Sequence, residues 1–281
     1  MISGNHHECL DECLRSLFVN PGERCAMKIV VSFKVVPDDQ DIVVDAEGAL
    51  DYSKAHQTVS QYDLNAVEVA AQLASETGSS LVAMTVGGTR IDDSKLKKNI
   101  LARGVDQLFM ATDDAYVQAD AHSTAQALST LLGTVGGYDL VVCGDGSADG
   151  FAQQVDVQLA ELLGIPCVVG AISIDVEDDF VVVKRMLESK IETVEVSLPA
   201  VISVSPDAAL PRICGMKDIL AAGKKPTTVV SFQEIGSPVD QAIEILEIKA
   251  PPQASRKLEI YDASNDGAID SFVTAVQETL R

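Results

Sequence analysis

Residues 141–150, VVCGDGSADG, combine residue types that could bind a phosphate group. An apolar run ends at Cys143, and a stretch rich in glycine, serine and aspartate follows before a new apolar periodicity begins at Phe151. This pattern predicts a buried strand, a tight loop and the first turn of a helix. Backbone N–H groups at such a junction can bind phosphate, but many proteins use the same junction only to turn the chain. The loop by itself leaves both interpretations open.

Under the phosphate interpretation, the glycines and the serine of the loop have clear tasks. Gly144, Gly146 and Gly150 would let the backbone come close to a ligand, because glycine has no β-carbon. Ser147 could offer its hydroxyl group as a further hydrogen-bond donor.

The residues after the loop support this interpretation, and two acidic residues oppose it. A helix that begins at Phe151 would point its N-terminus at the loop and favour an anion. Gln153 and Gln154 would then lie in the first helical turn with donor amides. Asp145 and Asp149 would add negative charge beside a phosphate, unless they cap backbone N–H groups or face water.

Alternating strands and helices must position this loop. We expect strands over 28–33, 80–86, 106–111 and 139–143, and helices over 60–78, 92–104, 119–136 and 151–164. This alternation predicts a parallel sheet with helices on both faces, joined by right-handed crossovers. Ligands bind at the carboxyl ends of the strands in such sheets. Three of these ends are rich in glycine or turn residues, at 34–41, 87–88 and 144–150.

The pattern changes after Pro166. Residues 180–186 and 191–198 predict a β-hairpin, and 199–205 a further strand. A proline-containing loop then leads into a short helix before residue 225. From Pro226 onward the chain is interrupted by prolines and finishes in an amphipathic segment near 268–280. This tail has no room for a core of its own, so we expect it to lie on something else.

The composition limits the class of protein. Hydrophobic residues make up 47% and aromatic residues only 4%, which suits a valine- and alanine-rich core of buried parallel strands. The net charge of −21 argues against nucleic acid as a partner. No apolar run approaches the roughly 18 residues that a membrane helix needs. The six cysteines lack a CxxC pair or zinc-ligand spacing, so we expect reduced thiols in a cytoplasm and no metal site.

The first 26 residues differ from the rest of the chain. They lack the apolar core of a secretory signal, and an apolar strand begins directly after Met27. We therefore expect a non-native or disordered leader, with Met27 as the natural start. The alternative is a short metal site formed by His6, His7, Cys9 and Cys13.

Five segments, in this order, resemble one known family. They are VVSFKVVPDDQDI, SQYDLNAVEVA, GDGSADGFAQQV, LPAVISV and LPRICGMKDILAAGKK. From Met27 to its end, the chain resembles the β subunit of electron transfer flavoproteins, and most of all the FixA-like bacterial branch of anaerobic carnitine and acyl-CoA metabolism. The resemblance implies a Rossmann-like α/β fold of the adenine nucleotide alpha-hydrolase type, with a β-hairpin and an extended C-terminal arm.

The resemblance also implies a function. The chain would be an electron carrier without catalytic residues, paired with an α subunit that holds FAD. It would itself hold AMP, or FAD if the complex is a flavin-bifurcating one. Electrons would pass between an acyl-CoA-type dehydrogenase and a quinone or ferredoxin-linked acceptor. The implied domains are a nucleotide-binding domain at 27–225, with a recognition loop near 206–222, and an arm at 226–281 that packs on the partner subunit.

The resemblance also implies site residues, at the positions of this chain that match the nucleotide-binding positions of the family. The implied nucleotide contacts are Ser32, Ser60, Gln61, Tyr62, Asp63, Gly87, Gly144, Asp145, Gly146, Ser147, Ala148, Asp149, Gly150, Gln153, Gln154 and Val155. Without the resemblance, Ser32 is a buried strand residue, Ser60 a helix cap and Gly87 a turn glycine.

The recognition loop of the family maps onto Pro211, Arg212 and Met216. Met216 is either an exposed apolar anchor for partner dehydrogenases or a residue that packs the short helix onto the sheet. The chain departs from the family at Asp39, where non-bifurcating members have an aromatic residue near the partner's flavin. The flavin potentials of the family therefore cannot be inherited.

These motifs also have alternative interpretations. Cys143 could suggest redox chemistry, but its apolar strand favours an inert buried thiol. A regulatory nucleotide-binding module of the universal-stress type shares the sheet architecture, but would lack the hairpin, the recognition loop and the arm. An adenylate-forming or ATP-cleaving enzyme would need a pyrophosphate loop of the SGGxDS type after the first strand, where this chain has SFKVVPDD.

Overall fold

The structure is a computed structural model that describes residues 26–236, 241–252 and 258–280. The described residues divide into a large unit, within Met1–Val43 and Tyr52–Leu246, and a small unit, within Val44–Asp51 and Glu247–Arg281. The expected leader at 1–26, with its alternative metal ligands, lies outside the described residues except for residue 26.

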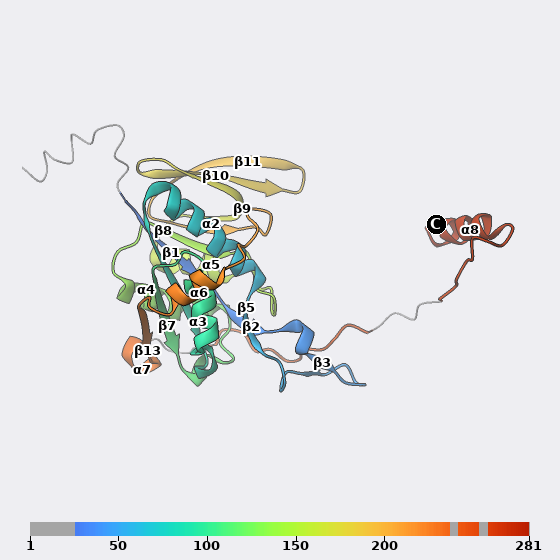
Figure 1. Cartoon of the computed structure of the whole chain (residues 1–281), viewed down its shortest axis with the longest axis horizontal. Helices are drawn as coiled ribbons and strands as arrows, with labels where there is room; N and C mark the ends of the chain where they lie inside the picture. Colours follow the sequence, from blue (N-terminus) through green and yellow to red (C-terminus); the bar gives the residue numbers. More distant parts are fainter. Residues whose placement is uncertain (1–25, 237–240, 253–257, 281) are drawn as a thin grey trace, which may run out of the picture. The chain divides into compact units, whose positions relative to one another are not determined.

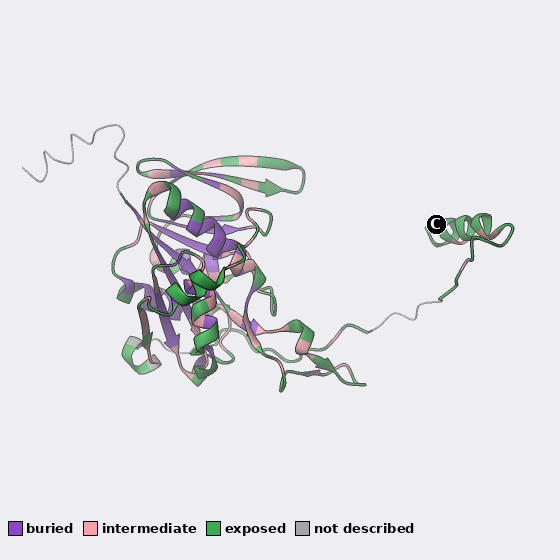
Figure 2. Ribbon diagram, viewed as in Figure 1, coloured by how far each residue is buried: buried purple, intermediate pink, exposed green. Residues whose placement is uncertain are grey.

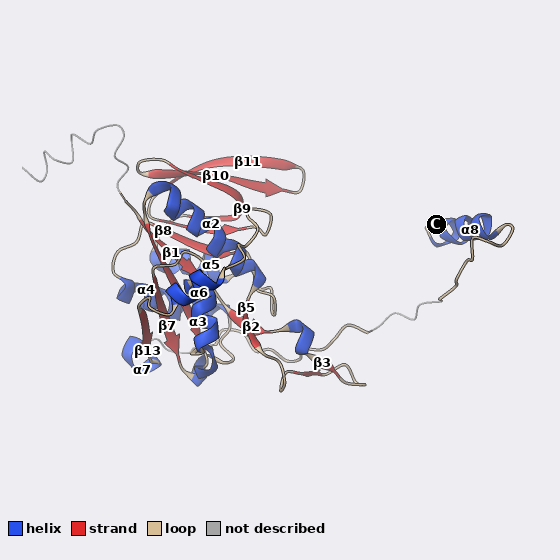
Figure 3. Ribbon diagram, in the orientation of Figure 1, coloured by secondary structure: helices blue, strands red, loops and turns tan. Residues whose placement is uncertain are grey.

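A nine-stranded sheet forms the centre of the large unit (Figures 1 and 3). In spatial order its strands are β11 (Lys190–Ser197), β10 (Phe180–Leu187), β9 (Cys167–Val176), β12 (Ala200–Val204), β8 (Leu140–Gly144), β1 (Lys28–Ser32), β6 (Ser80–Gly87), β7 (Gln107–Thr112) and β13 (Thr227–Val230). Neighbouring strands from β9 to β13 are parallel, whereas β10 pairs antiparallel with β9 and β11. The predicted α/β class, with its mostly parallel sheet and its hairpin, is confirmed.

Helices cover both faces of the sheet. One face carries α2 (Gln61–Thr77), α3 (Ser94–Leu101) and α6 (Met216–Ala222), and the other carries α4 (Ala121–Val135) and α5 (Val155–Leu163). Strand β1 contributes to the hydrophobic core on each face of the sheet. Ile29 and Val31 face the first set of helices, and Val30 faces the second. Figure 2 shows the central strands as buried, as expected of nearly continuous apolar runs in parallel strands.

The remaining described elements are short or belong to the small unit. They are β2 (Val35–Pro37), η1 (Asp39–Asp41), β3 (Val43–Val44), β4 (Leu50–Asp51), β5 (Gln57–Val59), η2 (Thr89–Ile91), η3 (Asp114–Tyr116), α7 (Phe232–Ile235) and α8 (Ala268–Thr279). Strands β2 and β5 pair antiparallel after the carboxyl end of β1.

The expected helix over 151–164 was wrong at its start. Helix α5 begins at Val155, because Phe151 and Gln153 have φ angles of 44° and 54°. These left-handed values are incompatible with a right-handed helix. Gln153 and Gln154 therefore precede the helix and do not lie in its first turn.

Two strands of the nine-stranded sheet were not expected from the sequence. Strand β9 joins the sheet between the hairpin and β12, and β13 extends the far edge by pairing in parallel with β7. Because β13 belongs to the sheet, the large unit continues past the expected boundary at residue 225 and reaches Leu246.

The strand order reverses at β1. The chain runs from β1 outward through β6 and β7, then returns to place β8 on the other side of β1. Such a switch point opens a crevice beyond the carboxyl ends of the two central strands, where open α/β sheets bind ligands. The loop at 144–150 leaves β8 at this point.

Candidate functional site

A cavity of about 360 Å³ lies at the switch point. The ends of β1 and β8 form its floor, where the Ser32 hydroxyl donates a hydrogen bond of 3.1 Å to Sγ of Cys143. The loop that follows β8 and the start of α5 form further parts of its wall. This volume is near the lower end of the range of roughly 300–1,000 Å³ for ligand pockets.

Asp63 holds the loop against the end of β1. It is a buried residue in the first turn of α2, and its Oδ2 accepts a hydrogen bond of 2.8 Å from the backbone N–H of Lys34. The backbone N–H of Gly144 donates to the same carboxyl group. Burial raises the pKa of Asp63 to about 7, although these N–H groups and Ser60 oppose the shift. One carboxyl group therefore fixes both walls of the crevice.

The tight contact with Asp63 explains the first glycine of the loop. A β-carbon on Gly144 would lie 2.6 Å from Oδ1 of Asp63 and 2.9 Å from the backbone carbon of Tyr62. Real atoms do not approach so closely, so a side chain at this position must displace the start of α2. Gly150 differs, because a β-carbon there would meet nothing within 4 Å.

Asp149 accepts hydrogen bonds from loop donors that we expected a phosphate to accept. Its carboxylate accepts hydrogen bonds from the Ser147 hydroxyl (2.6 Å), the Gly150 N–H (2.7 Å) and Nζ of Lys34 (2.7 and 2.8 Å). Burial disfavours its charge, but Lys34 and these donors hold the pKa of Asp149 below its usual value. A ligand phosphate at these groups must therefore compete with an ionised carboxylate.

The aromatic ring of Phe151 supports the loop from outside the cavity. The ring packs against Tyr62, with 5.1 Å between the ring centroids. It also lies over Gly146, where a β-carbon would come within 2.5 Å of the ring. The Phe151 ring therefore excludes a β-carbon at Gly146. The expectation from the sequence was that a ligand phosphate would need this space. The positive φ angles of Phe151 and Gln153 concentrate backbone strain at this turn.

Ten of the expected nucleotide contacts line the cavity. They are Ser32, Asp63, Gly144, Asp145, Gly146, Ser147, Gly150, Gln153, Gln154 and Val155. The others are not among its lining residues: Ser60, Gln61, Tyr62, Gly87, Ala148 and Asp149. Three of these stabilise the loop instead. Oγ of Ser60 accepts a hydrogen bond of 3.3 Å from the N–H of Ala148, and Asp149 accepts the hydrogen bonds described above.

Sequence reasoning missed much of the cavity wall. The additional lining residues are Phe33, Lys34, Val86, Ala119, Asp120, Ala121, Thr124, Leu128, Cys143, Ala152, Asp156, Ile243 and Ile245. Lys34 lies directly after the first strand, so its position at a carboxyl strand end was a usable signal. The side chains of α4 and of 243–245 reach the cavity only through the tertiary fold.

The cavity is acidic. Among the described residues that line it, Lys34 is the one cation, against Asp63, Asp120, Asp145 and Asp156. Burial and the neighbouring charge of Asp156 raise the pKa of Asp145. Oδ1 of Asp145 is buried and accepts no hydrogen bond from the described residues. A buried carboxylate oxygen without a hydrogen-bond partner is rare in folded proteins.

Cys143 has the environment of an inert thiol, as expected. It is buried in β8, and burial raises its pKa far above the usual range. Burial also raises the pKa of Cys167 to about 12. Neither side chain is therefore a thiolate at neutral pH.

An exposed apolar segment precedes and includes α6. Ile213 is 98% exposed and Met216 is 73% exposed, so Met216 does not pack the helix onto the sheet. Arg212 has another role, because its guanidinium faces inward to the buried carboxylate of Glu68, with distances of 2.6 Å (Nε–Oε2) and 3.0 Å (Nη2–Oε1). Asn65 adds hydrogen bonds to the carbonyls of 206 and 209. Helix α2 thus holds the base of this segment.

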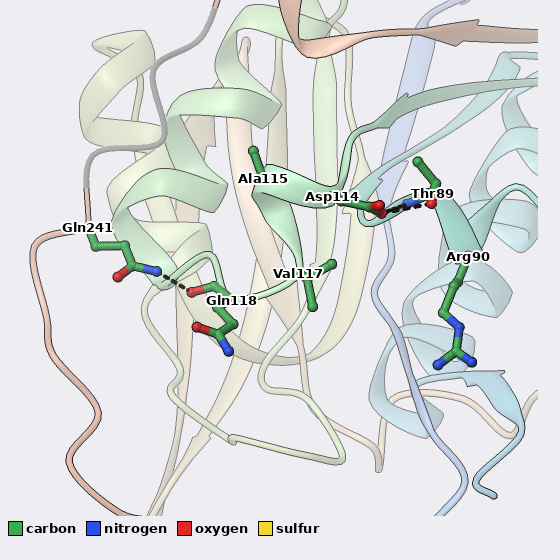
Figure 4. Close-up of a pocket in the computed structure, with 7 residues that line it drawn as sticks. All are labelled: Thr89, Arg90, Asp114, Ala115, Val117, Gln118 and Gln241. Carbon is green, nitrogen blue, oxygen red and sulfur yellow. Dashed lines mark hydrogen bonds between the residues drawn. The ribbon is translucent and has the colours of Figure 1, made fainter. Parts of the chain in front are cut away.

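A second depression, of about 650 Å³, lies among Thr89, Arg90, Asp114, Ala115, Val117, Gln118 and Gln241 (Figure 4). Thr89 donates to Oδ1 of Asp114 through its N–H (3.0 Å) and its hydroxyl (2.7 Å). Among the described residues that line it there is neither a glycine nor an expected site residue. It lacks the glycine-rich loop of the first cavity.

Within 26–236, 241–252 and 258–280, no helix is long and apolar enough to cross a membrane. No group of three metal-ligating side chains converges there either.

Comparison with protein families gives a match over most of the chain. The model of the electron transfer flavoprotein domain matches residues 48–235. The match includes α2, the loop after β8, the hairpin and the exposed segment at α6. Proteins of this family carry electrons, associate with flavin or AMP, and form heterodimers. Because the match spans well over half of the chain and includes the glycine-rich loop at 144–150, this chain belongs to the electron transfer flavoprotein family.

Proposed function

We propose that this chain is the β subunit of an electron transfer flavoprotein of the FixA-like branch. It pairs in the cytoplasm with an α subunit that holds FAD, and it has no catalytic residue of its own. The complex carries electrons from an acyl-CoA-type dehydrogenase to a quinone or ferredoxin-linked acceptor. FAD supplies the redox chemistry, and this chain supplies a nucleotide site and docking surfaces.

One observation carries the proposal: a glycine-rich loop closes a cavity at the switch point of the sheet. The lining of the cavity supports an adenine nucleotide, because Lys34 and the side-chain donors of Ser147, Gln153 and Gln154 lie there. The volume of about 360 Å³ favours AMP over the much larger FAD.

The expected nucleotide contacts have different tasks in this proposal. Ser32 and the backbone of 144–150 contact the ligand, while Gln153 and Gln154 offer amide donors from the turn before α5. Asp63 and Ser60 position the loop. Phosphate binding draws Lys34 away from Asp149, and a monophosphate is favoured because the cavity has one cation among several carboxylates.

The segment at 206–222 docks the dehydrogenase through apolar contacts. Met216 and Ile213 are the exposed apolar side chains that a partner would cover. Arg212 acts through Glu68, and Pro211 helps to shape the loop that carries Met216. In this proposal, Arg212 is a positioning residue.

The arm packs on the α subunit. Helix α8 has no buried residue, and its apolar side chains Ile269, Phe272 and Val273 are exposed in the chain by itself. The arm begins after Leu246, because β13 belongs to the sheet. Expressed without its partner, the chain should aggregate.

Co-purification tests this function. The tagged full chain is isolated from its host, the complex is heated, and the released small molecules are analysed by mass spectrometry. A yellow heterodimer that releases AMP and one FAD is expected. Two FAD would place a flavin in this chain and indicate a bifurcating complex.

Two other results would contradict the proposal. One FAD with no second nucleotide would show that the loop only turns the chain. A colourless, stable homodimer would support a nucleotide-binding regulatory module of the universal-stress type.

A further inference from the structure

The nucleotide cavity has an apolar side. The glycine-rich loop leaves β8 on one side of β1, and β6 lies on the other side. On the β6 side, the cavity is lined by Val86 of β6, by Ala119, and by Leu128 of α4. Ile243 and Ile245 complete the apolar lining, although they come from a segment far away in the sequence.

Residues 241–246, here called the strap, are tied to the start of α4. The Gln241 side chain donates a hydrogen bond of 2.7 Å to the carbonyl of Gln118, as Figure 4 shows. The backbone N–H groups of Ala242 and Ile243 donate to Oδ2 of Asp120, at 2.7 and 3.0 Å. Oδ1 of Asp120 accepts from the N–H of Ser123 at 2.8 Å and thereby caps α4. A single carboxylate therefore fixes the strap to the helix that forms the cavity wall.

The strap leaves apolar surface uncovered. Ile243 is 51% exposed and Ile245 is 65% exposed, although both line a cavity that also contains four carboxylates. Exposed isoleucines gain stability when an apolar group covers them. Ribose and phosphate are polar, so the base is the part of a nucleotide whose faces suit this surface.

We propose that the strap is the base-binding wall of the nucleotide site, with Ile243 and Ile245 in contact with the purine and Asp120 as the residue that positions them. This inference rests on the proposed nucleotide function. It adds a region outside every segment that the family resemblance assigned to the site.

The first test measures the affinity for AMP of the heterodimer after its bound nucleotide has been removed, by isothermal titration calorimetry. The Ile243→Ala, Ile245→Ala double variant should bind AMP about ten- to a hundredfold more weakly, because it loses most of the apolar contact. Ile248→Ala is the matched control: Ile248 is 58% exposed and does not line the cavity. It should bind AMP like the wild type.

The second test concerns Asp120. In Asp120→Asn, one oxygen can still cap α4, but the amide group presents donors to the N–H groups of the strap. We expect weaker AMP binding with unchanged helix content. Asp93→Asn is the control, because Oδ1 of Asp93 caps α3 and no strap depends on it. In the wild type, AMP should slow hydrogen–deuterium exchange in 241–246.

The outcomes distinguish a failure of the proposed function from a failure of the proposed role of the strap. A wild-type complex that does not bind AMP overturns the proposed function and the inference with it. If the wild type binds AMP, and the double isoleucine variant binds it as tightly as the Ile248→Ala control, only the proposed role of the strap is overturned. Unchanged hydrogen–deuterium exchange in 241–246 on adding AMP also overturns the strap.

Discussion

Asp63 should make the stability of this protein decrease as the pH rises toward neutrality. The residue is 6% exposed, and its burial raises the pKa from an ordinary 3.8 to about 7. Between these two values the folded chain keeps a proton on Asp63 and the unfolded chain does not. Stability falls with pH wherever the folded state binds more protons. The contribution of Asp63 is therefore largest below pH 4 and is lost as the pH passes 7.

The expected effect can be measured in a practical pH range. From pH 5.5 to 8.5 the wild type should lose about 2 kcal/mol through this group, since one pKa unit corresponds to about 1.4 kcal/mol. Asp63→Asn cannot titrate. Its amide group meets the N–H of Lys34 or Gly144 with a donor, which costs a nearly constant amount of about 1–3 kcal/mol.

The assay is urea unfolding of the full chain at pH 5.5, 7.0 and 8.5, at one protein concentration, because association shifts apparent stability. The wild-type minus Asp63→Asn difference in unfolding free energy should fall by about 2 kcal/mol over this range. Asp93→Asn is the control: backbone N–H groups of Leu96 and Lys95 lower the pKa of Asp93, so its difference should stay constant. A constant difference for Asp63→Asn would refute the reasoning, and would show that the N–H donors outweigh burial.

Three further predictions follow from the contacts described. Gly144→Ala should destabilise the chain by about 1–3 kcal/mol through overpacking, whereas Gly150→Ala should change it by less than about 0.5 kcal/mol; equal thermal midpoints would contradict this. Arg212→Met should cost about 3 kcal/mol in urea unfolding because Glu68 becomes an unpaired buried charge, and adding Glu68→Met should restore most of it. Iodoacetamide should leave Cys143 unmodified in the folded chain and alkylate it in urea, as peptide mass spectrometry can check.

The sheet was largely predictable because its strands and helices have distinct periodicities. The apolar runs at 28–33 and 139–143 correspond to the two central strands, and Gly78 stops α2 in a left-handed conformation. Strands β9 and β13 could not be found in this way. The side chains of β9 alternate irregularly between buried and exposed, and β13 has four residues that follow a proline. Pairing with neighbours makes them strands, and that information is not local.

The candidate site was predictable only in part. The glycine-rich loop was evident from residue types, but the start of α5 was misplaced because no propensity rule anticipates left-handed Phe151 and Gln153. The ring of Phe151 packs against Tyr62, a contact that only the tertiary fold creates. The role of Asp149 depended on Lys34, more than a hundred residues earlier. The strap approaches Asp120 from a similar distance in sequence.

The position of the strap in the chain has a consequence for biosynthesis. Every other lining residue of the cavity lies between Ser32 and Asp156, whereas Ile243 and Ile245 come last. Strand β12, which pairs with β8 beside the cavity, ends at Val204. A ribosome that adds about 5–20 residues per second then needs roughly 2–8 s more to reach Ile243. The apolar side of the cavity lacks the strap during this interval, so under the proposed function a nucleotide can enter the nascent domain before the strap exists.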